Sequence, residues 1–317
     1  MTANIFERFR RAWRDRLDRP AIVEPGASSY SYGDIDRLSA QFAAALIGLG
    51  LAPGERVVAQ VEKSVGAVAL YLATLRAGGV FIPLNTAYTP SEVAFFLEDA
   101  RPCIFICQPE KRAALASVAR AANVSHVAEL GPTAADGFWR AALELAPFNS
   151  VVSRDGEDLA SILYTSGTTG RSKGAMLSHR ALATNAEALS DIWGLSSSDV
   201  LLHALPIFHI HGLFVALNTS FLNASTIIFL SSFTPHKVRK HLRDATVMMG
   251  VPTYYSRLLD DGITRDECRH IRLFISGSAP LTEEASNAWM ARTGCKILER
   301  YGMTEAGMIA SNPLAGE

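Results

Sequence analysis

The sequence has almost no net charge, and neither sign of charge dominates it. Its 317 residues include 30 Lys and Arg against 31 Asp and Glu, which gives a formal net charge of −1. Proteins that bind nucleic acid through its phosphates usually carry a strongly basic surface, so we expect no nucleic-acid partner. Electrostatic interactions that matter for function are expected to be local and to come from a few side chains in one site.

Cysteine is also scarce. The sequence contains four residues of this type, namely Cys103, Cys107, Cys268 and Cys295. Because no two of them have Cys-x-x-Cys spacing, we expect free thiols in a reducing compartment.

Long hydrophobic runs are missing as well. The apolar stretch at 65–75 is too short to span a bilayer and is closed by Arg76. The first 20 residues are rich in arginine but include Glu7 and Asp15, and they lack the apolar segment of a signal peptide. They predict a short amphipathic helix. Together these features favour a cytoplasmic protein without a membrane span.

The sequence does contain an alternation of strand and helix patterns. At 317 residues with 49% hydrophobic content, the chain exceeds a single core, so two packed subdomains are expected. Strand patterns lie at 56–61, 80–83, 104–107, 159–164, 226–230, 247–250 and 273–276, and helix patterns lie at 64–77, 89–100, 178–193, 235–244 and 282–292. This alternation predicts an α/β fold with crossover connections. We expect a first α/β subdomain over 1–157, with a loop-rich connection at 109–157, and a second over 158–317.

The most informative segment is 164–179, Tyr-Thr-Ser-Gly-Thr-Thr-Gly-Arg-Ser-Lys-Gly-Ala-Met-Leu-Ser-His. Glycines let backbone N–H groups approach an anion, while hydroxyl groups and a lysine add hydrogen bonds and positive charge. The candidate phosphate-binding residues are Thr165, Ser166, Gly167, Thr168, Thr169, Gly170 and Lys173. The spacing is not that of the Walker loop, because the fifth residue after Gly167 is Ser172 rather than glycine. A flexible surface turn is the alternative interpretation.

A second motif, Glu-Arg-Tyr-Gly-Met-Thr-Glu, occupies 299–305. Together with the segments 75–84, 205–212, 250–254 and 274–281, the two motifs resemble those of the acyl-adenylate-forming superfamily. That superfamily includes acyl-CoA synthetases, peptide-synthetase adenylation domains and luciferases. Within the superfamily, the residues of these motifs are most similar to those of the malonyl-CoA synthetases. The resemblance extends over nearly the whole chain.

The resemblance implies a fold and a chemistry. The fold is the large N-terminal domain of adenylate-forming enzymes, in which α/β/α subdomains with mixed sheets are stacked. The chemistry is that of an ATP-dependent acid–thiol ligase using ATP, Mg²⁺ and CoA. Relatives continue past the second motif with a ribose-binding Asp, a hinge and a small C-terminal lid domain with a catalytic lysine. Because this sequence ends at Glu317, we expect an N-terminal fragment without the lid, poorly active by itself.

The resemblance also gives the motif residues their roles. The phosphate-binding residues would hold the β- and γ-phosphates, with Thr165 and Lys173 counted among the catalytic residues. Glu305 would ligate Mg²⁺ together with Thr165, Thr304 would contact the α-phosphate, and Tyr301 would stack on adenine. The other nucleotide-binding candidates are Gly277, Ser278, Ala279, Pro280, Glu299, Gly302 and Met303. Outside these motifs, Tyr301 would be an ordinary core aromatic residue and Glu305 a solvated acid.

Three histidines, His203, His209 and His211, lie close together in the sequence. A zinc site is not favoured, because no cysteine or carboxylate lies at ligand spacing from them. The resemblance places His209 at the acyl pocket and at the tunnel used by CoA, so it counts among the catalytic and substrate-binding residues. For His211 we expect a packed structural role.

A malonate substrate would need a cation in the acyl pocket. Its second carboxylate must stay ionised inside the protein, and leaving such a charge unpaired is costly. Arg300 is the first candidate for this cation, Arg257 is the second, and Ser278 could add a hydroxyl group. The alternative is that Arg300 pairs with Glu299 or Glu283 and that Arg257 lies on the surface of a helix.

These features predict a ligase that activates malonate, or a close small dicarboxylate such as methylmalonate, as acyl-AMP and transfers it to CoA. Two alternatives stay open at this point. The first is a CoA ligase for a short or aryl monocarboxylic acid. The second is an ATP-binding module with little turnover.

Overall fold

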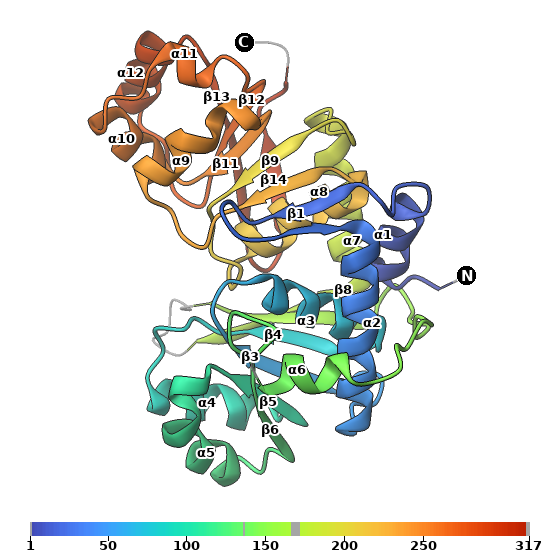
Figure 1. Cartoon of the computed structure of the whole chain (residues 1–317). Helices are drawn as coiled ribbons and strands as arrows, with labels where there is room; N and C mark the ends of the chain where they lie inside the picture. The colour runs from blue at the N-terminus through green and yellow to red at the C-terminus, as the bar shows by residue number, and fades with distance from the viewer. Residues whose placement is uncertain (1, 136, 166–171, 315–317) are drawn as a thin grey trace. The chain divides into compact units, whose positions relative to one another are not determined.

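The computed structural model describes residues 2–135, 137–165 and 172–314, and the chain divides into two compact units (Figure 1). The first unit contains the residues up to 11 and 33–182, and the second contains 12–32 and the residues from 183 onward. The chain passes between the units within α1 (Ile5–Trp13) and α7 (His179–Ile192) and at the start of α2 (Tyr32–Gly48). The expected ranges of 1–157 and 158–317 divide the chain differently, because the strands on both sides of the phosphate motif belong to the first unit.

A mixed sheet of six strands forms the centre of the described part of the first unit, in the order β6-β5-β3-β4-β7-β8. The strands are β3 (Arg56–Gln60), β4 (Val80–Pro83), β5 (Ile104–Cys107), β6 (His126–Glu129), β7 (Leu159–Thr165) and β8 (Lys173–Ser178). Neighbouring strands are parallel except for β7 and β8, which are antiparallel. The expected short apolar strands at 80–83 and 104–107 are confirmed.

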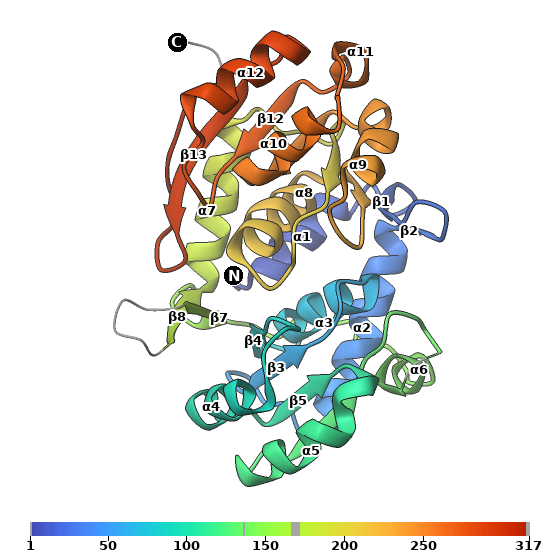
Figure 2. The same cartoon turned by 90° about the vertical axis from the view of Figure 1, so that its left-hand side faces the viewer.

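Helices cover both faces of this sheet. They are α3 (Val65–Arg76), α4 (Pro90–Ala100), α5 (Arg112–Ala121) and α6 (Gly137–Leu143), with a single 3₁₀ turn at Pro109–Lys111. Helices α4 and α5 pack on the strands through Phe96 and Leu115, on the face opposite to α3 (Figure 2). Helix α4 begins with the expected cap, because Thr89 and Glu92 form a capping box in which each side chain accepts a hydrogen bond from the other's backbone N–H.

The second unit contains a mixed sheet of eight described strands in the order β14-β13-β12-β11-β9-β10-β1-β2. These are β1 (Pro20–Val23), β2 (Ser29–Ser31), β9 (Val200–His203), β10 (Thr226–Phe229), β11 (Val247–Gly250), β12 (Leu273–Ser276), β13 (Ile297–Met303) and β14 (Gly307–Ser311). The six strands from β13 to β1 are parallel, and the edge strands β14 and β2 run antiparallel to their neighbours.

This second sheet is also covered on both faces, which gives three layers. The remaining helices are α8 (Asn218–Asn223), α9 (Pro235–His241), α10 (Pro252–Asp260), α11 (Arg265–Cys268), α12 (Glu283–Thr293), a π-helix at His211–Leu217 and a 3₁₀ turn at Leu242–Asp244. Helices α9 to α12 pack together on one face around Tyr255 and Trp289, and lie beside β11 and β12 in Figure 1. Helix α7 and the π-helix pack on the other face through Leu189 and Val215.

One expectation about secondary structure was wrong. Segment 109–157 is not mainly a loop, because it contains α5, β6 and α6 before an irregular stretch leads to β7. The helix expected over 178–193 is confirmed as α7, and strand β8, which was not expected, precedes it. In the part of the chain that the structure describes, no helix is both long enough and apolar enough to cross a membrane.

Candidate active site

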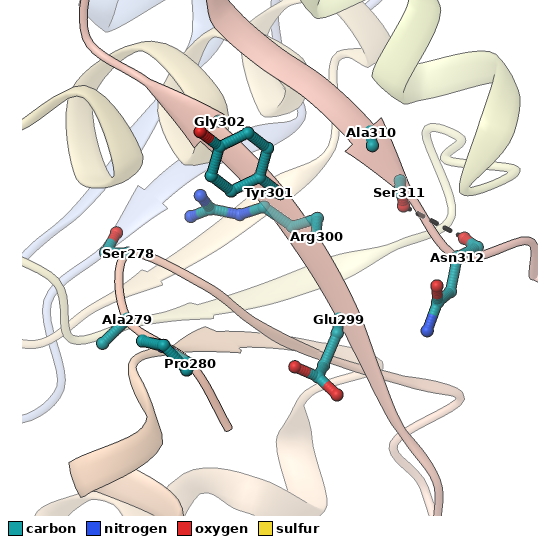
Figure 3. Close-up of a pocket in the computed structure, with 10 residues that line it drawn as sticks. All are labelled: Ser278, Ala279, Pro280, Glu299, Arg300, Tyr301, Gly302, Ala310, Ser311 and Asn312. Carbon is teal, nitrogen blue, oxygen red and sulfur yellow. Dashed lines mark hydrogen bonds between the residues drawn. The ribbon is translucent and has the colours of Figure 1, made fainter. Parts of the chain in front are cut away.

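The second sequence motif and the segment after β12 lie side by side in the second unit. Strands β12 and β13 are parallel neighbours, with Ser276 in register with Glu299. The chain that leaves β12 therefore runs beside the carboxyl half of β13, where a parallel sheet usually binds ligands. The two segments and β14 line a pocket of about 450 Å³ (Figure 3). Its lining residues are Ser278, Ala279, Pro280, Glu299, Arg300, Tyr301, Gly302, Ala310, Ser311 and Asn312.

A second pocket of about 410 Å³ shares Ser278, Arg300 and Gly302 with the first. It also contains residues from the segment before the π-helix and from the end of β13. The residues that line it alone are Leu205, Pro206, His209, Ile210, His211, Gly212, Val251, Met303, Thr304 and Met308. Apart from Arg257, Gly277 and Glu305, the sequence-predicted site residues of this unit thus line two adjoining pockets, and Ser278, Arg300 and Gly302 line both.

Arg300 is a buried cation. Its side chain is 6% exposed, and within the described residues its Nε and Nη2 atoms have no hydrogen-bond partner. The expected alternative, a pair with Glu299 or Glu283, is not formed; Figure 3 shows the guanidinium extending toward Ser278 and the Glu299 carboxylate lying away from it. Burial lowers the pKa of Arg300 to about 10, so the group stays protonated at neutral pH.

His211 faces the same pocket and is 2% exposed. Its Nδ1 atom lies 3.3 Å from the Oγ atom of Ser278, and its Nε2 atom has no hydrogen-bond partner among the described residues. Burial, followed by the nearby charge of Arg300 and by His203, lowers the pKa of His211 well below its ordinary value. The ring is therefore neutral at physiological pH. His209 lines the pocket too, and burial lowers its pKa as well.

Tyr301 and Glu305 lie near the surface of the β13–β14 hairpin. Tyr301 is 64% exposed, which leaves its ring face available for a ligand, and it is not the core aromatic residue of the alternative interpretation. Glu305 is exposed in the turn between the two strands, next to the half-buried Thr304. Within the described residues, no group of three or more His, Cys, Asp or Glu side chains is arranged to hold a metal ion.

The two ends of the phosphate motif are paired in the first unit. Thr165 is the last residue of β7, Lys173 is the first of β8, and the two are directly in register across the antiparallel ladder. The ladder therefore holds the ends of the intervening segment close together. The candidates within that segment, Ser166, Gly167, Thr168, Thr169 and Gly170, lie outside the described residues.

Arg257 does not reach either pocket. It is exposed on α10, and its guanidinium carbon lies 5.1 Å from the centre of the Phe233 ring. That ring in turn stacks on Tyr254, with 3.7 Å between ring centres. Of the two expected cations, the structure brings Arg300 to the pocket of about 410 Å³, together with Ser278, and leaves Arg257 on the surface of a helix.

A comparison with known protein families decides where the chain belongs. The family described as AMP-binding enzyme matches residues 9–317. The chain is a member of the AMP-binding enzyme family. This confirms the resemblance drawn from the two motifs, and the two stacks of helices on mixed sheets agree with the fold expected for the N-terminal domain of adenylate-forming enzymes.

Several relatives of this AMP-binding chain are known. Malonate–CoA ligase ACSF3 of Mus musculus is 35% identical over 277 residues, which cover 82% of this chain and 47% of the relative. The crystal structure of apo MatB from Rhodopseudomonas palustris is 48% identical, with a TM-score of 0.95 over 100% of this chain and 63% of that chain. A benzoate CoA ligase from Burkholderia xenovorans LB400 is 25% identical, with a TM-score of 0.85 over 99% and 63%. The chain spans about half the length of the curated relatives it matches.

Some pocket residues of this AMP-binding chain were not predicted. Residues 310–312 line the first pocket because β13 turns back into β14, and the turn at 304–306 followed by the apolar pair Met308 and Ile309 is the signal that would have predicted this hairpin. His211 was expected to be structural. In the structure it is the first residue of the π-helix and lines the pocket of about 410 Å³, and sequence periodicity does not reveal this arrangement.

Proposed function

We propose that the chain is the substrate-binding part of an ATP-dependent acid–CoA ligase that activates malonate or a close small dicarboxylate such as methylmalonate. The observation that carries this proposal is the buried Arg300 guanidinium at the acyl pocket. Burying a cation without a partner is costly, so such a group is retained where an anion binds. The non-reacting carboxylate of a dicarboxylic acid is an anion of the right kind.

The atoms left without partners fit a carboxylate. Nε and Nη2 of Arg300 lie on one edge of the guanidinium, and that edge can donate two parallel hydrogen bonds to the two oxygens of one carboxylate. The apolar side chains of Leu205, Ile210 and Val251 line the same pocket and would contact the carbon between the two carboxyl groups. A monocarboxylic acid would leave the buried charge uncompensated.

The nucleotide would occupy the neighbouring pocket. The exposed ring of Tyr301 is suited to stacking on adenine, and the small residues Ala279 and Pro280 allow the base to approach the backbone on the opposite side. In the first unit, Lys173 and the hydroxyl group of Thr165 would hold the β- and γ-phosphates. The related MatB from Rhodopseudomonas palustris has been crystallised with ATP bound, which supports this part of the proposal.

Mg²⁺ fits the residues present. This ion usually takes one or two protein carboxylates and completes its shell with phosphate oxygens and water. The exposed carboxylate of Glu305 at the β13–β14 turn meets that requirement without a cluster of ligands. When bound, the ion would neutralise charge on the departing pyrophosphate.

The reaction needs no protein nucleophile. A carboxylate oxygen of the acid would attack the α-phosphorus of ATP, and the bond to pyrophosphate would break to give acyl-AMP. The CoA thiolate would then attack the acyl carbon and AMP would leave. The protein aligns the two reactants: Arg300 fixes the distant carboxylate, Thr304 contacts the α-phosphate, and His209 lines the path to the acyl carbon.

Two other functions are distinguishable from this one. A CoA ligase for a short or aryl monocarboxylic acid is supported by the similarity to a benzoate CoA ligase, but the buried Arg300 does not favour it. An ATP-binding module with little turnover would bind nucleotide without forming acyl-AMP. A cytoplasmic location remains part of the proposal, although the mouse relative is a mitochondrial protein.

The test is acyl-adenylate formation trapped by hydroxylamine, with malonate, methylmalonate, acetate and benzoate as substrates. We expect malonate or methylmalonate to give the highest kcat/KM. Arg300→Ala should lower kcat/KM for the dicarboxylates at least about thirtyfold, which corresponds to the smallest loss usually seen when one partner of a buried charge pair is removed. The value for acetate should change little. Equal losses for all four acids would overturn the dicarboxylate assignment. ATP binding without any hydroxamate would support the module with little turnover.

A further inference from the structure

We propose that His211 is the second donor to the non-reacting carboxylate, acting as a neutral imidazole beside Arg300 and held in its tautomer by Ser278. This inference rests on the proposed dicarboxylate function and names a specificity residue of that site. Three observations lead to it: the unpartnered ring nitrogen of His211, its place in the pocket, and its contact with Ser278.

The first observation concerns unsatisfied atoms. Nε2 of His211 is buried and has no hydrogen-bond partner among the described residues, and the same holds for Nε and Nη2 of Arg300. Leaving a buried polar atom unpaired costs free energy, so a cluster of such atoms around one cavity indicates a polar ligand. All of these atoms belong to residues that line the pocket of about 410 Å³.

In this proposal the hydroxyl group of Ser278 donates to Nδ1 of His211 and so sets which ring nitrogen carries the proton. The exposed Ser278 hydroxyl lies 3.3 Å from Nδ1 of His211 and can donate its hydrogen there, because its lone pairs remain free for other donors. Nε2 then carries the hydrogen and becomes a donor directed to the ligand. Ser278 itself has a positive φ of 70°, a strained backbone conformation for a residue other than glycine, as is often found at ligand sites.

A neutral second donor suits this site better than a second cation. One guanidinium already balances the single charge of the distant carboxylate, and a further buried cation would remain uncompensated. Burial and the charge of Arg300 both disfavour a protonated His211. The imidazole therefore adds a hydrogen bond to a carboxylate oxygen without adding charge.

The experiment is isothermal titration of this chain with two stable acyl-AMP analogues, one malonyl and one acetyl, in which a sulfamate replaces the acyl phosphate. In the unmodified chain the malonyl analogue should bind more tightly. His211→Leu should weaken the malonyl analogue by about ten- to a hundredfold, the range expected for one hydrogen bond to a charged group, and leave the acetyl analogue unchanged. His211→Gln should recover much of the loss, because its amide nitrogen can reach the place of Nε2. His236→Leu, an exposed histidine on α9, serves as the matched control and should change neither affinity.

The outcomes separate this inference from the proposed function. If the unmodified chain binds both analogues equally, the dicarboxylate assignment fails and the role of His211 fails with it. If it prefers the malonyl analogue but His211→Leu weakens both analogues alike, or neither, Arg300 remains the anion site and the role of His211 is overturned. Unfolding in urea without ligand shows whether His211→Leu is folded. If it is not, the role of His211 is judged from His211→Gln, which should keep most of the preference of the unmodified chain for the malonyl analogue.

Discussion

The guanidinium of Arg300 lies directly against the backbone of Gly277. A Cβ atom added at position 277 would lie 2.5 Å from Nε and 2.7 Å from Nη1 of Arg300, much closer than real contacts allow. Residue 277 follows β12 and Arg300 lies on the adjacent strand β13, so the missing side chain makes the space that the arginine occupies. The glycine thus determines where the buried cation points.

Gly277→Ala should move Arg300 out of the pocket. The backbone at 277 does not have a positive φ, so the effect of the added methyl group is steric. We expect a destabilisation of about 1–3 kcal/mol, the usual cost of overpacking, together with loss of the preference for a malonyl over an acetyl analogue. Urea unfolding and calorimetric binding measure the two effects. Gly48→Ala is the control: it lies at the end of α2 with open space around it, and should be neutral or slightly stabilising. Unchanged selectivity in Gly277→Ala would contradict the positioning role.

Arg300→Met should not destabilise the chain when no ligand is present. The substitution removes a buried charge without a partner and keeps most of the apolar volume, so the free energy of unfolding should stay the same or rise by about 1 kcal/mol or more. Urea unfolding at neutral pH measures it. A loss of several kcal/mol would show that Arg300 supports the fold rather than a ligand.

Tyr301→Ala should weaken ATP binding without affecting the fold. Its ring is largely exposed, so truncation should change the free energy of unfolding by no more than about 0.5 kcal/mol. Loss of stacking on a base costs about 1–3 kcal/mol, which corresponds to a weakening of about five- to more than a hundredfold in affinity. Titration calorimetry with ATP and Mg²⁺ tests this, and unchanged affinity would remove Tyr301 from the adenine site.

His179→Asn should reduce the sensitivity of the fold to acid. His179 is fully buried at the start of α7, its Nδ1 accepts a hydrogen bond from the N–H of Ile5 at 3.3 Å, and burial lowers its pKa to about 4. Between pH 6.5 and 4 the unfolded chain takes up a proton that the folded chain does not. The stabilisation is therefore complete above pH 6.5 and falls by up to about 3 kcal/mol as the pH drops through this window.

The measurement is the free energy of unfolding of both forms from pH 7 to pH 4. Asparagine keeps an acceptor for Ile5 but has no titratable group, so the difference between the two curves should shrink as the pH falls. Parallel curves would show that His179 does not contribute to the pH dependence. His236→Asn, at an exposed position, should follow the unmodified chain throughout.

Much of the fold could be predicted because local patterns and tertiary packing agree. Strands such as β4, β11 and β12 are short apolar runs bounded by turn residues, and their limits were predicted without error. The alanine-rich α5 was missed although alanine favours helices, because its buried face consists of only Leu115 and Ala119. Strand β6 was missed because its four residues are not fully buried and include two polar ones.

In the candidate site, too, some features could be predicted from the sequence and others could not. The sequence could name Arg300 as a candidate, because it precedes Tyr301 in the motif at 299–305 and a malonate substrate needs a cation. The role we propose for His211 was not predictable, because an unpartnered ring nitrogen facing a cavity is a property of the folded chain. Arg257 was a candidate from sequence order alone, but its position on α10 directs it to Phe233 instead.

The most direct test of the central claim, that Arg300 binds the second carboxylate of a dicarboxylic acid, is thermal unfolding of this chain with Mg-ATP and with stable malonyl-AMP and acetyl-AMP analogues at equal concentration. A ligand at a hundred times its dissociation constant stabilises the fold by about 2.7 kcal/mol, so a difference in affinity appears as a difference in unfolding temperature. We predict a clearly larger shift with the malonyl analogue, and its disappearance in Arg300→Met. Equal shifts with both analogues in the unmodified chain would contradict the claim.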